Sequence, residues 1–219
     1  MNSDLKLPAE PGNEISKSRT EFLTDGVYAI VMTLLVLEIT VPELTHSEVA
    51  AGDLPKQLLG LLPVILSYGL SFIILGFFWI YHHILFHYIK RTDRVFVWLT
   101  VFYLMFVAFI PFSTALLGEY NDQQISVVIY GINIAIVGFW THIQWWYATR
   151  DHCLVDSDLD PTFITIMSRS SLIGPIFYLI AVALSFVSTW ISLVMFIGIP
   201  LYYLVPIRKD KSRFWFTKN

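Results

Sequence analysis

Four histidines have the residue type and spacing that could bind a metal ion or a haem: His82, His83, His87 and His142. His83 and His87 are four residues apart, which places two imidazoles on one face of a helix, as zinc or haem iron can require. Structural zinc needs four ligands, and the single cysteine, Cys153, completes no thiolate set. A polar network is therefore the preferred interpretation, and a His-ligated haem or metal protein is an alternative.

A second polar group, Arg19, Thr24 and Asp25, lies at or near the start of an apolar segment. Ionised side chains at this position in a membrane helix are costly, so they usually pair with one another or line water. Thr24 and Asp25 could instead cap the helix. Together with the histidines, Arg19 and Asp25 could serve a proton-coupled transporter. Such transporters are commonly built from internal repeats, and the sequence shows none.

An apolar stripe follows these polar residues. Ile30, Leu34 and Leu37 occur at positions i, i+4 and i+7, which share one face of a helix, and Thr33 is beside them. Such a stripe is typical of ordinary helix packing. Repeated around a symmetry axis, it could instead exclude water and gate ions. Glu38 stands near the outer end of this segment, either at the membrane interface or in an acidic ring at an outer mouth.

The composition indicates that these residues are positioned by membrane helices. Of the 219 residues, 56% are hydrophobic and 14% are charged, and the mean hydropathy is +0.64. These values exclude a disordered chain and an ordinary soluble enzyme domain. A membrane helix needs about 20 apolar residues. The sequence predicts an all-α polytopic membrane protein whose six helices cover residues 22–41, 58–86, 95–117, 125–147, 162–187 and 190–207.

Two function classes find no support in the sequence. The net charge of −3 provides no basic excess for binding nucleic acid. No phosphate-binding loop, serine-hydrolase elbow, zinc-protease motif or dinucleotide fingerprint is present, so we predict that the chain is not an enzyme.

Lysine and arginine positions predict the orientation. With a cytoplasmic N-terminus, the inner segments hold twelve of the 14 basic residues, the outer loops hold only Lys56, and Arg169 lies within the fifth helix. We therefore expect both termini in the cytoplasm. The predicted organisation is an N-terminal tail (1–18), a six-helix transmembrane domain (19–207) and a basic C-terminal tail (208–219).

Three motifs resemble the bacterial transmembrane protein 175 family of potassium channels. Residues 19–38 resemble the family's first helix, although its usual Phe-Ser-Asp-Gly reads Leu-Thr-Asp-Gly here. Residues 78–83, Phe-Trp-Ile-Tyr-His-His, are similar to its Trp-x-x-His-His stretch. The third motif is Pro-Phe-Ser-Thr-Ala-Leu-Leu-Gly at residues 111–118, and an asparagine common upstream of it is Thr100 here.

The resemblance implies a channel in the bacterial inner membrane that moderately favours potassium over sodium, without a carbonyl selectivity filter. The sequence indeed contains no Thr-Val-Gly-Tyr-Gly segment. Bacterial members assemble as homotetramers with the first helix lining the pore, so the expected partners are lipid, monovalent cations and further copies of the chain. No cofactor is implied beyond the permeant ions. Ile30 would form the constriction, with Thr33, Leu34 and Leu37 beside the ion path. The implied polar network consists of Arg19, Thr24, Asp25, Trp79, His82 and His83.

Overall fold

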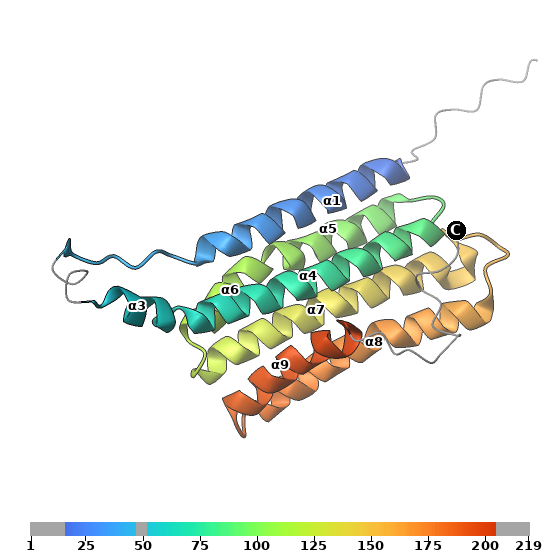
Figure 1. The fold of residues 1–219 in the computed structure, drawn as a ribbon. Coiled ribbons are helices and arrows are strands. Elements are labelled where there is room, and N and C mark those ends of the chain that lie inside the picture. The colour runs from blue at the N-terminus through green and yellow to red at the C-terminus, as the bar shows by residue number, and fades with distance from the viewer. Residues whose placement is uncertain (1–15, 47–51, 205–219) are drawn as a thin grey trace, which may run out of the picture.

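The computed structural model describes residues 16–46 and 52–204. This part of the chain is a bundle of helices, which confirms the predicted all-α fold (Figure 1). The elements are α1 (Lys17–Leu34), η1 (Leu35–Glu38), α3 (Leu54–Gly60), α4 (Leu62–Tyr88), α5 (Arg94–Ala108), α6 (Ile110–Glu119), α7 (Gln124–Thr149), η2 (Arg150–His152), α8 (Pro161–Leu184) and α9 (Thr189–Leu204). The predicted boundaries of the two tails lie largely outside the described residues and stay predictions.

Five helical stretches are long and apolar enough to cross a membrane: Lys17–Glu38, Leu62–Tyr88, Arg94–Glu119, Gln124–His152 and Pro161–Leu184. A shorter apolar helix follows at Thr189–Gly198, within α9. These stretches follow the order of the predicted segments, and six membrane crossings stay a prediction. The last does not reach the length of a full crossing within the residues described.

Proline divides two segments that the sequence predicts as continuous. Pro63 lies in the first turn of α4, so the segment predicted over 58–86 is split between α3 and α4. Pro111 likewise lies in the first turn of α6, after α5 has ended at Ala108. Proline has no backbone N–H and fits the first turn of a helix, where that donor has no intrahelical partner.

The helices are arranged so that α1 lies along one edge of the bundle. It packs against α4, α5 and α6, whereas α8 packs on α7 and α9 at the opposite edge (Figure 1). The α7–α8 contact is close at Gly138. A Cβ atom built there would lie 2.4 Å from Cγ of Pro175. The position of α1 leaves one of its sides uncovered by the rest of the chain.

The end of the bundle that holds the α1 N-terminus is tied together by its connecting segments. An isolated backbone bridge pairs Ile89 with Val155, and Lys90 forms an ion pair with Asp156 at 3.7 Å. Arg91 Nε donates to the Cys153 carbonyl at 2.8 Å. The connections after α4 and after α7 therefore lie at the same end of the bundle, as the segment order predicts.

Candidate ion pathway along the first helix

The two sides of α1 differ sharply in exposure. Its inner side is buried against the bundle through Thr20, Thr24, Tyr28, Val31 and, at the start of η1, Leu35. On the other side, Ile30 is 59% exposed, Leu34 is 40% exposed and Leu37 is 69% exposed. An apolar side that a single chain leaves open must be covered by lipid or by another protein surface.

The backbone that carries the predicted stripe changes from an α-helix to a 3-10 turn at its outer end. Ile30 and Leu34 are in the α-helical part, but Leu37 lies in the tighter 3-10 turn Leu35–Glu38. A 3-10 turn rotates each residue by about 120°, so the three steps from Leu34 to Leu37 make about one full turn and keep Leu37 on the same side as Leu34. All three side chains are exposed.

Thr33 supplies an oxygen atom among these apolar side chains. It is exposed, and its hydroxyl donates to the Ile30 carbonyl at 2.7 Å. A hydroxyl has one donor hydrogen and two acceptor lone pairs, so donation to the backbone leaves the oxygen able to face a cation.

Asp25 and Trp79 join α1 to α4. The Trp79 Nε1–H donates to Asp25 Oδ1 at 2.9 Å. The His83 ring stacks on the Trp79 ring, with centroids 5.9 Å apart and an interplanar angle of 27°. Three of the six residues expected in a polar network thus lie side by side on the exposed surface near the inner end of α1. Their role in conduction stays a prediction.

The structure places the other three residues of the expected network elsewhere. Thr24 is buried and donates to the Thr20 carbonyl of its own helix at 3.0 Å. Arg19 is exposed, and no ion pair joins it to another described residue. His82 is only 3% exposed and stacks on Tyr103 of α5, with centroids 5.2 Å apart. Adjacent helical residues differ by about 100° in direction, which explains why His82 and His83 have different surroundings.

The remaining predicted site residues are dispersed. Glu38 ends the 3-10 turn at the opposite end of α1 from Arg19 and is partly exposed. His142 Nδ1 and Ser171 Oγ form a hydrogen bond of 2.8 Å that joins α7 to α8. Among the described residues, no three histidine, cysteine, aspartate or glutamate side chains are grouped closely enough to hold a metal ion.

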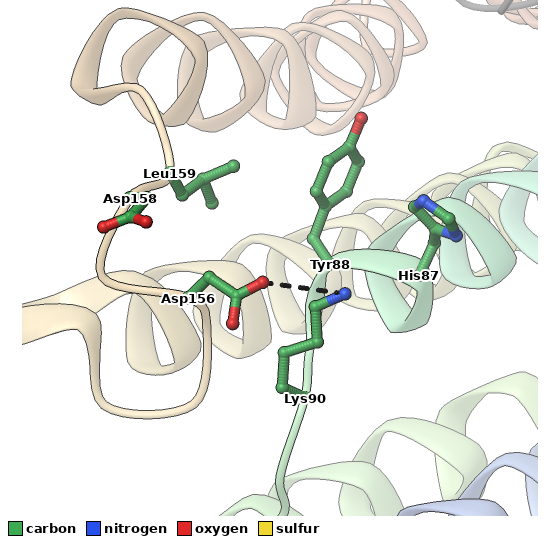
Figure 2. A pocket seen from close by; sticks show the side chains of 6 residues that line it. All are labelled: His87, Tyr88, Lys90, Asp156, Asp158 and Leu159. Atoms are coloured by element: carbon green, nitrogen blue, oxygen red, sulfur yellow. Dashed lines mark ion pairs between the residues drawn. The ribbon is translucent and has the colours of Figure 1, made fainter.

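His87 borders a pocket of about 240 Å³ at the end of α4 (Figure 2). The other residues lining this pocket are Tyr88, Lys90, Asp156, Asp158 and Leu159. Lys90 and Asp156, which both line the pocket, form an ion pair, so their opposite charges offset each other there (Figure 2). The pocket lies where α4 meets the segment before α8, and its lining includes no residue of α1.

One buried contact behind α1 was not predicted from the sequence. The hydroxyl groups of Tyr28 and Tyr103 form a hydrogen bond between α1 and α5. Both residues are almost fully buried, with exposed fractions of 1% for Tyr28 and 0% for Tyr103. The only available signal was that each is a tyrosine within an apolar helix. Buried tyrosine hydroxyls need partners, but a partner 75 positions away is not readable from spacing.

Five helical stretches that are long and apolar enough to cross a membrane define a multi-pass α-helical membrane protein. A family model described as endosomal/lysosomal potassium channel TMEM175 matches residues 19–111. A potassium channel of Chamaesiphon minutus is 35% identical over 198 residues, covering 89% of this chain and 96% of the relative. The chain therefore belongs to the TMEM175 family, which consists of ion channels and not of enzymes.

Structural similarity agrees with this assignment. The crystal structure of a lysosomal potassium-selective channel TMEM175 homologue from Chamaesiphon minutus superposes with a TM-score of 0.75. It is 33% identical, with 85% of this chain and 95% of that chain covered. The endosomal/lysosomal proton channel TMEM175 of Gallus gallus is 36% identical over 114 residues, which is 50% of this chain but 23% of that protein. Members of the family are therefore named for two different ions.

Proposed function

We propose that this protein is a passive cation channel that favours potassium over sodium and conducts along the exposed side of α1. The observation that carries the proposal is the exposure of Ile30, Thr33, Leu34 and Leu37 on α1, whose opposite side is buried. The potassium-channel relatives support the choice of ion.

The proposed assembly is a homotetramer in which four copies of α1 surround a central axis. A single exposed stripe cannot enclose an ion, but four symmetry-related stripes form a closed ring. In this arrangement Ile30 gives a narrow apolar throat, and Leu34 and Leu37 extend it toward the outer end. Glu38 would add an acidic ring that attracts cations to the mouth.

Selectivity would arise from partial dehydration. An ion crossing an apolar throat loses part of its water shell, and potassium holds that shell less tightly than sodium does. The Thr33 oxygen atoms would replace some of the lost water ligands. A throat of side chains offers fewer fixed oxygen ligands than a carbonyl filter, so we expect moderate rather than extreme discrimination.

A proton channel is the second candidate, because the chicken relative is named as one. The Asp25–Trp79–His83 group contains two titratable side chains at the inner end of α1. A proton-coupled transporter would use the same groups. Unitary currents in a planar bilayer separate a channel from a carrier, which gives slow and saturable flux.

Ion flux into liposomes tests the proposal directly. Purified protein reconstituted into liposomes should give rapid flux under a potassium gradient and much slower flux under an equal sodium gradient. Empty liposomes should give neither flux. A pH-sensitive dye in the lumen should report little proton flux at neutral pH. Proton flux without potassium flux would replace the potassium proposal with the proton one.

The proposed location is the bacterial inner membrane with both termini in the cytoplasm. The described basic residues support this orientation. Lys56 lies at one end of the bundle, whereas Lys17, Arg19, Lys90, Arg91, Arg94 and Arg150 lie at the other. Short loops rich in lysine and arginine stay on the cytoplasmic side.

The single cysteine makes this orientation measurable. Cys153 is exposed in the connection between α7 and α8, at the basic end. A membrane-impermeant maleimide should therefore label it in inverted vesicles but not in intact cells. The matched control is Asp122→Cys in a Cys153→Ser background, because Asp122 is exposed in the connection between α6 and α7 at the other end. Labelling of Cys153 from outside intact cells would reverse the proposed orientation.

A further inference from the structure

A buried cluster of side chains from four helices lies behind α1. We call it the tyrosine cluster, and its members are Tyr28 on α1, His82 on α4, Tyr103 on α5 and Thr141 on α7. The Tyr28 and Tyr103 hydroxyls are hydrogen-bonded. His82 lies nearly parallel to Tyr103, at an interplanar angle of 6°. The Thr141 side chain lies next to the Tyr103 hydroxyl. Every member is buried.

The tyrosine cluster holds α1 at the height of the proposed constriction. Tyr28 and Ile30 are two residues apart, which corresponds to about 3 Å along a helix and about 200° around it. Their exposures agree with opposite directions, since Tyr28 is buried and Ile30 is open. A shift of the Tyr28 hydroxyl relative to Tyr103 would therefore move Ile30 toward or away from the axis.

We propose that the Tyr28–Tyr103 hydrogen bond positions α1 and thereby sets the balance between open and closed pores. This inference rests on the proposed function, because it concerns the pore that α1 would line. Tyr28 and Tyr103 are positioning residues, since neither lies on the exposed side. If one hydroxyl is lost, the other is left unpaired in a buried site. Tyr103 has a second polar neighbour in Thr141, so a change in helix position can relieve that loss.

Single-channel recording of the reconstituted full-length chain tests the proposal. We expect Tyr28→Phe and Tyr103→Phe each to change the open probability about fivefold and in the same direction, which corresponds to one net hydrogen bond. The double variant should resemble either single variant, because both remove the same bond. If Tyr28→Phe gives no folded protein, Tyr103→Phe removes the same hydrogen bond from the α5 side.

Tyr130→Phe is the matched control. Tyr130 is a buried tyrosine of α7 whose hydroxyl is hydrogen-bonded to Ser71 of α4 at 3.0 Å, so this variant also loses a buried hydroxyl but leaves α1 untouched. It should lower thermal stability and leave open probability within about twofold of the unmodified protein. The inference is overturned if the Tyr28 and Tyr103 variants behave like Tyr130→Phe, or if their effects add. Absence of potassium current in the unmodified protein would instead overturn the proposed function. The inference about Tyr28 and Tyr103 would then fail as well, because it rests on that function.

Discussion

Ile30→Asn should raise unitary conductance about fivefold and move the potassium-to-sodium permeability ratio toward one. The isoleucine side chain is 59% exposed in the single chain, and four copies would form a throat that water wets poorly. An asparagine amide can hydrogen-bond water and coordinate ions, so it lowers the cost of entering the throat. A barrier lower by about 1 kcal/mol corresponds to a rate about fivefold higher. Planar-bilayer recording with potassium and sodium on opposite sides measures both quantities.

The control for this substitution is Ile180→Asn. Ile180 is 45% exposed, but it lies on α8, at the edge of the bundle opposite to α1 (Figure 1). The same chemical change there should leave the permeability ratio unchanged. If Ile30→Asn also left conductance and selectivity unchanged, Ile30 would not lie at the constriction.

Gly138→Ala should destabilise the protein by about 2–3 kcal/mol, which lowers Tm by on the order of 5–10 °C. The added Cβ would lie 2.4 Å from Cγ and 3.0 Å from Cδ of Pro175. A proline ring within a helix cannot rotate away as a flexible side chain can, so α7 and α8 must separate. The better helix propensity of alanine, about 1 kcal/mol, offsets only part of this cost. Thermal unfolding of the purified protein in detergent measures the effect.

Gly174→Ala provides the comparison on α8, at the residue just before Pro175. A Cβ at Gly174 would have no atom within 4 Å, so only the helix-propensity gain remains. Its Tm should be unchanged or slightly higher. Equal loss of stability in the Gly138 and Gly174 variants would contradict the close α7–α8 contact.

Much of the fold was predictable from the sequence, because a membrane helix must satisfy its own backbone hydrogen bonds over a long apolar run. This requirement located the five helical stretches that are long enough to cross a membrane. It did not locate the break between α5 and α6 at Phe109, where the run stays apolar and only Pro111 marks the change. It also did not reveal the 3-10 turn that contains Leu37.

The candidate site was predictable only in part. The stripe from Ile30 to Leu37 followed from helical spacing, and the pairing of Asp25 with Trp79 followed from the family resemblance. The burial of His82 away from Asp25 could not be predicted, because the choice between His82 and His83 depends on the rotation of α4 in the bundle. The Tyr28–Tyr103 contact depends on how α1 and α5 pack, and spacing within one segment carries no information about it.

The most direct test of the central claim is a structure of the assembled protein in a lipid environment, at a resolution that shows the side chains of α1. The account predicts four copies around one axial passage, with Ile30 of each copy at its narrowest point and Thr33, Leu34 and Leu37 along its wall. An assembly in which the exposed side of α1 faces lipid, with no passage beside it, would contradict the account.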